Sequence, residues 1–138
     1  MSVLHARGVF KHFQEGRETV TVLRGIEFDV AQGEIVALQG PSGSGKTTFL
    51  SILGCILTPT DGRVVIEGEE VSEKKLAAIR RRSLGFVFQQ FNLFPSLTAI
   101  ENVEYALNVK RVKGREARVE AQRVIEAVGL GDRQNFLP

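Results

Sequence analysis

The sequence has few residues of the kinds that build covalent or metal chemistry. Among its 138 residues there is one cysteine, one methionine, one tyrosine and no tryptophan. A single cysteine excludes a disulfide framework within the chain and a thiolate metal site, and it is typical of a reducing, cytosolic setting. We interpret Cys55, which lies between Gly54 and Ile56, as a small buried apolar residue rather than a reactive thiol.

Net charge and long apolar runs are also scarce. The formal net charge of +2 is too small to indicate nucleic-acid binding. No run approaches the roughly 18 apolar residues of a membrane span, and the N-terminus lacks the basic and then apolar pattern of a signal peptide. An apolar content of 43% in 138 residues predicts one modest globular domain with its own core.

The most informative stretch runs from Ile35 to Leu53. Four apolar residues, Ile35–Leu38, predict a strand that is buried on both faces. The next segment, Gly40–Thr48, reads Gly-Pro-Ser-Gly-Ser-Gly-Lys-Thr-Thr and fits the phosphate-loop pattern. Apolar residues at helical spacing follow it, so the motif has the strand, loop and helix context that it requires. This context disfavours the alternative of a chance Gly/Ser-rich turn.

The residue types in this motif suit a polyphosphate. Backbone N–H groups must approach phosphate oxygens without intervening side chains, and the three glycines keep the loop small. A helix that begins near Gly45 points its unpaired N–H groups and the positive end of its dipole at the phosphate. Lys46 is predicted to supply charge to the β- and γ-phosphates, Thr47 to ligate Mg²⁺, and Thr48 to contact the α-phosphate.

Residues outside the motif predict further strands. Residues 2–13 alternate loosely, and residues 19–30 are β-branched and alternating with a break near Arg24-Gly25, so we expect an antiparallel sheet. Residues 63–67 predict a short strand. Leu84–Phe88 predicts a second buried strand that ends at Gln89.

A first helix is predicted over residues 73–82, with Ser72 as its N-cap. Its last turn carries Arg80, Arg81 and Arg82, which match the negative end of the helix dipole. We interpret this basic triplet as a solvated helix end rather than a nucleic-acid site.

Two more helices are predicted near the C-terminus. Thr98-Ala99-Ile100-Glu101 has the pattern of a capping box, so a helix begins there with Ile100, Val103 and Leu107 on its apolar face. A second helix is predicted over residues 115–128, with Gly129 as its C-terminal cap. Its expected apolar face consists of Ala117, Ala121, Val124 and Val128.

The order of these segments resembles the N-terminal part of an ATP-binding cassette (ABC) ATPase, the motor subunit of ABC transporters. The similarity covers nearly the whole chain and rests on Gly40–Thr48, Gly85–Pro95 and Leu97–Val103. The lipoprotein-release and macrolide-export group is the most similar, on Val22–Ile26, Ile52–Gly54 and Pro59–Gly62. The implied fold is α/β, with an antiparallel β segment (1–34), a P-loop core (35–90) and a partial helical subdomain (91–138).

The resemblance implies ATP and Mg²⁺ as cofactors. Phe13 falls where the family places an aromatic residue, more often Tyr, that stacks on adenine; the alternative is a core or edge-strand residue. Gln89 falls on the glutamine that approaches Mg²⁺ and the attacking water; the alternative is a strand-end cap. The implied catalytic residues are Lys46 and Gln89, and the implied metal ligands are Thr47 and Gln89. The implied nucleotide-binding residues are Phe13, Gly40, Ser42, Gly43, Ser44, Gly45, Lys46, Thr47 and Thr48.

The resemblance also implies partners. The region Phe91–Pro95 falls where such ATPases receive a coupling helix of a membrane permease subunit, although its aromatic rings also suit the core of the helical subdomain. A second ATPase subunit would face the first in a homodimer, and no nucleic acid is expected. The implied location is cytoplasmic, peripheral on the inner face of the cell membrane.

The sequence departs from the family pattern in one respect. Three motifs of the family are absent: the Leu-Ser-Gly-Gly-Gln type signature, the second carboxylate motif and the switch histidine. The signature should come just after a position like Pro138. His5 and His12 lie too far upstream to replace the switch histidine. We therefore expect an N-terminal fragment, truncated before the signature. Such a fragment would not hydrolyse ATP alone, and it would associate because its two buried strands lose their partners.

Two alternative functions remain at this stage. One is a nucleotide-binding module without turnover, which the missing carboxylates favour. The other is a small P-loop kinase, against which the long β segment before the loop and the Gln89 segment both argue.

Overall fold

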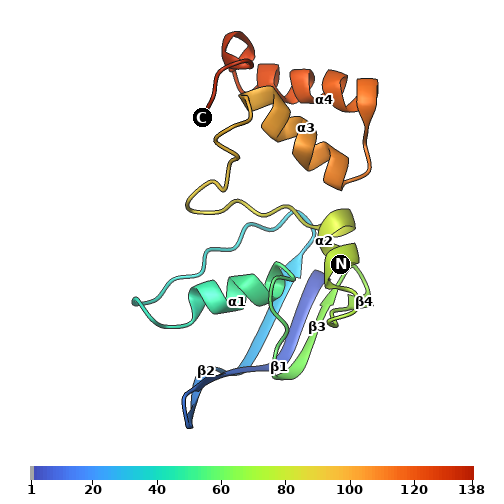
Figure 1. Ribbon diagram of the computed structural model, residues 1–138. Coiled ribbons are helices and arrows are strands. Elements are labelled where there is room, and N and C mark those ends of the chain that lie inside the picture. The colour runs from blue at the N-terminus through green and yellow to red at the C-terminus, as the bar shows by residue number, and fades with distance from the viewer. Residues whose placement is uncertain (1) are drawn as a thin grey trace. The chain divides into compact units, whose positions relative to one another are not determined.

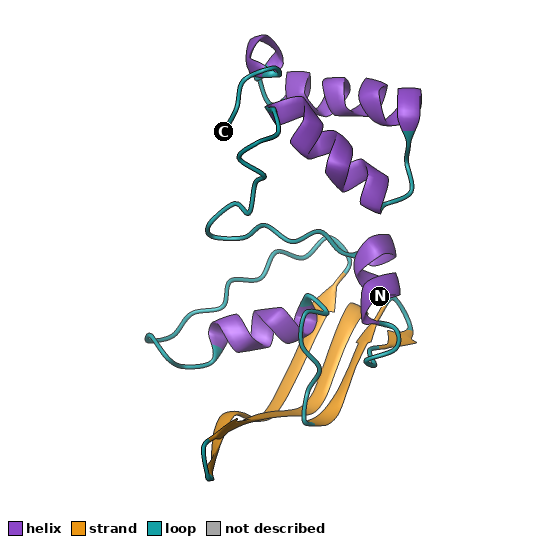
Figure 2. Ribbon diagram, in the orientation of Figure 1, coloured by secondary structure: helices purple, strands orange, loops and turns teal. Residues whose placement is uncertain are grey.

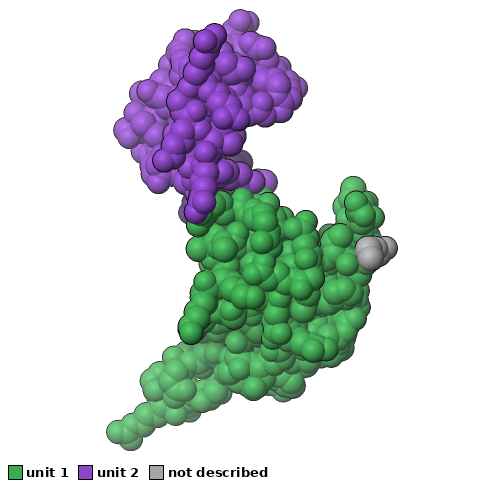
Figure 3. All heavy atoms as spheres, turned by 90° about the vertical axis from the view of Figure 1, so that its right-hand side faces the viewer, with its two compact units in different colours: residues 1–86 green, residues 87–138 purple. Residues whose placement is uncertain are grey.

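The computed structural model describes residues 2–138, which form two compact units. Unit 1 ends at Phe86 and unit 2 is Val87–Pro138 (Figure 3). In chain order the elements are β1 (Ser2–Glu15), β2 (Glu18–Ala31), α1 (Lys46–Leu53), β3 (Asp61–Ile66), β4 (Glu69–Glu70), α2 (Leu76–Ser83), α3 (Ala99–Val109), α4 (Gly114–Ala127) and the 3₁₀ helix η1 (Gly131–Arg133) (Figures 1 and 2). The three-part division expected from the sequence stays a prediction.

A four-stranded sheet with the order β2-β1-β3-β4 forms the centre of unit 1. Every neighbouring pair is antiparallel, which confirms the expected antiparallel segment. The predicted break near Arg24-Gly25 does not divide β2 into two strands. Instead the register with β1 slips there, and Gly25 takes a φ of 64° that residues with a side chain seldom adopt.

The core of unit 1 lies between this sheet and α1, which crosses one face of the sheet (Figure 2). Phe49, Ile52 and Leu53 bury the apolar face of α1, and the Phe49 ring meets the Phe28 ring of β2 edge-on with centroids 5.3 Å apart. Cys55 is fully buried in the same core, as predicted. Burial raises the pKa of its thiol, so the thiolate is disfavoured.

The two strands predicted to be buried are not strands in this structure. Ile35–Leu38 and Leu84–Phe88 have no regular secondary structure and belong to no sheet of residues 2–138. Ile35 is 98% exposed and Val87 is 92% exposed. The prediction was wrong because an apolar run becomes a strand only where a neighbouring strand pairs with its backbone. Association of the chain stays a prediction.

The first predicted helix is shorter than expected. Residues 73–75 form a turn, and α2 begins at Leu76. Lys75 is its N-cap residue and makes no side-chain cap bond, so the predicted cap at Ser72 is wrong. The Ser72 carbonyl instead accepts hydrogen bonds from the N–H groups of Lys75 and Leu76, which closes the turn before the helix.

In unit 2, α3 begins with the predicted capping box. The Thr98 side chain accepts the Glu101 N–H, and the Glu101 carboxylate accepts the Thr98 N–H. The next two N–H donors of the helix, at Ala99 and Ile100, bond to the carbonyls of Phe136 and Gln134. The end of the described chain thus completes the start of α3, which sequence patterns did not predict.

Helix α4 packs on α3 through a slightly different face from the one predicted. Ala117 and Ala121 are buried as expected, but Ile125 completes the buried face and Val128 is exposed. The helix ends at Ala127, and Val128 is its C-cap residue. Gly129 caps it with a φ of 75°, and its N–H bonds to the Glu126 carbonyl, as a Schellman motif requires.

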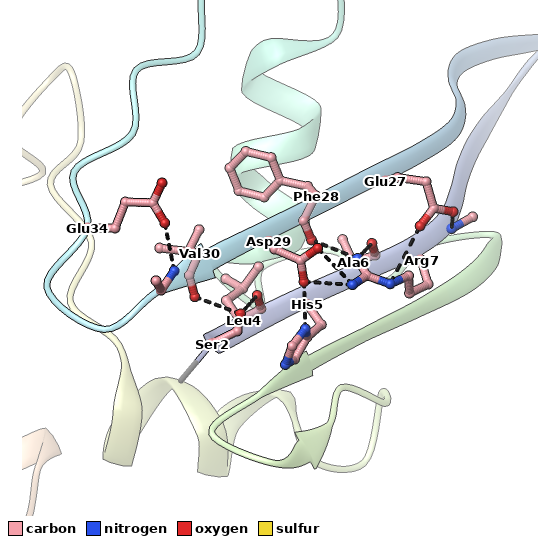
Figure 4. A network of polar contacts seen from close by, with 12 residues as sticks. Ser2, Leu4, His5, Ala6, Arg7, Glu27, Phe28, Asp29, Val30 and Glu34 are labelled. Carbon is pink, nitrogen blue, oxygen red and sulfur yellow. Dashed lines mark hydrogen bonds and ion pairs between the residues drawn. The ribbon is translucent and has the colours of Figure 1, made fainter.

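A network of polar contacts covers the β1–β2 face that carries His5, Arg7, Glu27 and Asp29 (Figure 4). The Asp29 carboxylate contacts His5 Nδ1 at 2.6 Å and accepts a hydrogen bond from Arg7 Nη2 at 2.7 Å. Glu27 lies 3.6 Å from Arg7 Nε and accepts the Gly8 N–H at 2.6 Å. The bond from Arg7, followed by that from His5, holds the pKa of Asp29 below its usual value, although partial desolvation opposes them.

We predict that Asp29→Asn lowers the midpoint of urea unfolding at neutral pH by a small amount, because the exposed network loses its charge. A carboxyl group with a lowered pKa stabilises the folded state above its unfolded pKa, near 3.8, and loses that contribution as the pH falls through the lowered value. The gap between wild type and variant should therefore close below pH 3.8. Glu18→Gln, at an exposed carboxylate without an ion pair in residues 2–138, is the control. A gap that is constant with pH would contradict the prediction.

Candidate nucleotide site

The phosphate-loop segment lies between β2 and α1, and its last glycine fixes the start of the helix. Gly45 is the N-cap of α1, with a φ of 87°. A Cβ atom at Gly45 would lie 2.9 Å from Leu23 Cδ2 and 3.1 Å from the Val22 carbonyl oxygen of β2. Both the backbone conformation and the contact with β2 therefore require glycine here. Because of this contact, the N-terminus of α1 sits against the sheet.

The loop folds around the Lys46 side chain. Lys46 Nζ donates hydrogen bonds to the carbonyl oxygens of Gly40 at 2.7 Å and Pro41 at 2.6 Å, and to Ser44 Oγ at 3.2 Å. A Cβ atom at Gly40, whose φ is 155°, would come within 2.9 Å of Ser44 Oγ. The loop is thus closed at its first glycine by Ser44, and the ammonium group is held over it.

The electrostatic field at this end of α1 is positive. The first turn of the helix contains no acidic residue, and its backbone N–H groups carry the positive end of the helix dipole. Lys46 adds a full charge at the same place. Thr47 and Thr48 lie in the first turn of α1, where Thr47 is exposed and Thr48 is half-buried. This arrangement suits an anion with several oxygens.

A cavity of about 370 Å³ lies beside the loop. It is lined by Leu23, Ile26, Phe28, Leu38, Gln39, Gly40, Pro41, Ser44, Gly45, Lys46 and Phe49. Its polar part is the loop itself and its apolar part comes from β2 and α1. The structure therefore brings together the predicted residues Gly40, Ser44, Gly45 and Lys46.

Phe13 lies elsewhere in unit 1, near the end of β1. It pairs with Val20 of β2, and its side chain is 37% exposed. Lys11 Nζ lies over its ring, 5.3 Å from the centroid. The ring does not line the cavity beside the loop, so its contact with a nucleotide stays a prediction. Sequence analysis missed Lys11, which the two-residue period of a strand places on the same face as Phe13.

Gln89 and the aromatic segment Phe91–Pro95 belong to unit 2. Gln89 is exposed in a turn, and its catalytic role stays a prediction. Phe91 and Asn92 both have positive φ, at 60° and 51°, a conformation that is rare for residues with a side chain. Phe94 packs its ring on Tyr105 of α3 with centroids 4.6 Å apart. One of the predicted rings therefore packs within unit 2, while Phe91 is mostly exposed.

Asn102 anchors this aromatic segment to α3. Its side-chain oxygen accepts the Phe94 N–H at 2.8 Å, and its amide nitrogen donates to the carbonyls of Phe94, Leu97 and Thr98. Sequence analysis did not single it out, because an asparagine one residue beyond a capping box has no distinctive pattern.

The residues present fit ATP and, in part, Mg²⁺. The glycine loop, the start of α1 and Lys46 offer the donors that phosphate oxygens need. Among residues 2–138 no group of three or more His, Cys, Asp or Glu side chains is placed to hold a metal ion. Mg²⁺ commonly combines a few protein oxygens with nucleotide phosphates and water, so the protein ligand of this loop would be the Thr47 hydroxyl.

Comparison with known proteins decides the family. The family model described as ABC transporter matches residues 23–138. The chain belongs to the ABC transporter family. The match includes the phosphate loop, α1 and the whole of unit 2.

Curated relatives of the chain belong to the same family. An uncharacterised ABC transporter ATP-binding protein of Thermotoga maritima is 48% identical, over 99% of this chain and 59% of the relative. The lipoprotein-releasing system ATP-binding protein LolD of Pseudomonas syringae is 45% identical, over 99% of this chain and 62% of that protein. The macrolide export ATP-binding/permease protein MacB of Brucella abortus is 44% identical, over 99% of this chain and 22% of that protein. The predicted similarity to the lipoprotein-release and macrolide-export group is confirmed, and the chain spans about 60% of the first two relatives.

Solved structures show the same fold. The dimeric ATP-binding cassette MJ0796 in a post-hydrolysis state, bound to ADP and phosphate, superposes with a TM-score of 0.87 at 39% identity, over 98% of this chain and 61% of that chain. The predicted fold class, an N-terminal part of an ABC ATPase, is confirmed. Within residues 2–138 we find no helix with the length and apolar character of a membrane span.

We predict that Lys46→Ala lowers the affinity of the chain for ATP at least tenfold. A charge-assisted hydrogen bond contributes about 1.5–3 kcal/mol, and Lys46 offers its charge where the loop and the N-terminus of α1 meet. Titration of a fluorescent ATP analogue against wild type and variant measures the effect. Lys74→Ala, which removes a charge from an exposed turn, is the control. Equal affinities of wild type and Lys46→Ala would contradict the assignment of the loop.

Proposed function

We propose that this chain is the ATP-binding part of an ABC transporter ATPase. Binding and hydrolysis of ATP by that ATPase drive transport by a membrane permease. The observation that carries this proposal is the loop at the start of α1, where Gly45 fits against β2 and Lys46 is held by loop carbonyls. Membership of the ABC transporter family supports it.

The residues of the loop and of the first turn of α1 bind different parts of Mg-ATP in this proposal. Backbone N–H groups of the loop and of the first helical turn bind phosphate oxygens, and Lys46 turns from the loop carbonyls toward the β- and γ-phosphates. The Thr47 hydroxyl ligates Mg²⁺, and Thr48 contacts the α-phosphate. Ser42 and Ser44 complete the loop.

Two residues outside the loop act on the ends of the nucleotide. The Phe13 ring stacks on adenine, which its partial exposure allows. Gln89, in the turn that begins unit 2, contacts Mg²⁺ and orients the attacking water. Phosphoryl transfer depends mainly on such positioning and on electrostatic stabilisation.

The proposed partners are a permease subunit and a second ATPase subunit. The segment Phe91–Pro95 receives the permease, because Phe91 and Leu93 are exposed while Asn102 fixes the backbone beside them. A dimer is supported by the dimeric cassette MJ0796, which has the same fold. In this arrangement the chain acts at the cytoplasmic face of the cell membrane.

A second candidate function is ATP binding without turnover by this chain alone. It is favoured because, among residues 2–138, no cluster of acidic side chains is placed to hold Mg²⁺ opposite Thr47.

We predict that the purified 138-residue chain releases no more phosphate from Mg-ATP than its Lys46→Ala variant does, although the wild type binds ATP at least tenfold more tightly. A coupled phosphate assay measures turnover, and size-exclusion chromatography in the same buffer measures association. A stable monomer with sustained turnover that Lys46→Ala abolishes would contradict the prediction.

We predict that Phe13→Ala weakens ATP binding by roughly two- to tenfold, because a stacked aromatic pair contributes about 0.5–1.5 kcal/mol. Phe13→Tyr keeps the ring and should bind as well as wild type. Melting temperature and ATP affinity are measured on the same samples. If Phe13 only stabilises the fold, alanine lowers the melting temperature at constant affinity, and tyrosine is destabilising too.

A further inference from the structure

Lys11 connects the ring that is proposed to stack on adenine with the segment that follows α1. Its ammonium group lies over the Phe13 ring, 5.3 Å from the ring centroid. The same nitrogen donates a 2.8 Å hydrogen bond to the Thr58 carbonyl, in the segment between α1 and β3. One side chain thus contacts the ring proposed for the base and the segment that follows the phosphate-binding helix.

The segment around Thr58 is itself tied to β1. The Thr60 N–H donates to the Phe10 carbonyl at 2.8 Å, and the Thr60 hydroxyl accepts the His12 N–H at 3.0 Å. Lys11 lies between these two strand positions. Its hydrogen bond to Thr58 therefore starts from a fixed backbone, which limits the positions that Nζ can reach.

The charge of Lys11 is not neutralised nearby. Among residues 2–138 no carboxylate forms an ion pair with it. The Phe13 ring lies within the range of about 6 Å over which a cation attracts the face of an aromatic ring. A surface lysine that only solubilised the sheet would extend into water, whereas this one is half-buried and directed to a carbonyl and a ring.

We propose that Lys11 is a positioning residue for the base of the bound nucleotide. Its charge holds the Phe13 ring by one face and draws electron density toward that face. The ring then keeps one orientation and stacks more strongly on an electron-rich purine. This inference rests on the proposed function, specifically on Phe13 as the stacking partner of adenine.

The test compares a ligand that has a base with one that has none. Affinities for ATP and for inorganic tripolyphosphate are measured by calorimetry for wild type, Lys11→Met and Lys11→Arg. Lys11→Met keeps the length of the side chain but removes the charge and the donor. It should lower the affinity for ATP about two- to fivefold, the range expected for a cation over a ring at a partly exposed site, and leave the affinity for tripolyphosphate unchanged. Lys11→Arg, which restores a cation, should bind ATP like the wild type.

Two outcomes would overturn the inference. If Lys11→Met binds both ligands more weakly by the same factor, the charge acts on the phosphates or on the fold. If it binds both like the wild type, Lys11 does not position the base. Lys74→Met is the control for a lost lysine charge, and melting temperatures of all variants report the fold.

A second pair of variants separates this inference from the proposed function. If Phe13→Ala leaves the ratio of the affinity for ATP to the affinity for tripolyphosphate unchanged, Phe13 does not stack on the base. The inference about Lys11 then fails too. If Phe13→Ala lowers the ratio but Lys11→Met does not, only the inference fails. When Lys11 acts through the ring, the double variant should show no further loss of ATP affinity beyond that of Phe13→Ala.

Discussion

The packing of α1 against β2 is the constraint on which the site depends. The Phe49 ring on Phe28 fixes the middle of the helix, and the absence of a side chain at Gly45 lets the start of the helix touch Val22 and Leu23. These two contacts set the direction of the helix axis, and with it the direction of the dipole and of the first N–H groups. Burial of the apolar residues of α1 therefore positions the polar residues at its start.

Local patterns in the sequence predicted several local features, although the N-cap at Ser72 was not one of them. The hairpin of β1 and β2, the capping box at Thr98 and the glycine after α4 all depend on contacts between residues that are close in sequence or on a single backbone angle. The phosphate loop belongs to the same class, because its glycines, Lys46 and Ser44 lie within a few residues of one another. The position of the loop before a helix could therefore be predicted, while the contacts of its residues with a nucleotide stay a prediction.

Features that depend on distant partners were not predicted correctly. The apolar run at Ile35–Leu38 has the composition of a buried strand, but composition does not state whether a neighbouring strand is present. The hydrogen bonds from Ala99 and Ile100 to the carbonyls of Phe136 and Gln134, which follow η1, join residues more than thirty positions apart, and no local pattern encodes them. The contact of Lys11 with Thr58 is of the same kind, since it joins β1 to the residues after α1.

The hydrogen bonds within the loop have a consequence for selectivity among anions. The Lys46 ammonium already has three acceptors, at Gly40, Pro41 and Ser44. An arriving anion must exchange with these acceptors, so the observed affinity is the difference between two sets of hydrogen bonds. An ion with a single charge gains little from this exchange, whereas a chain of phosphates gains at several oxygens together. Under the proposed function, this exchange favours a nucleotide triphosphate over chloride and other simple anions.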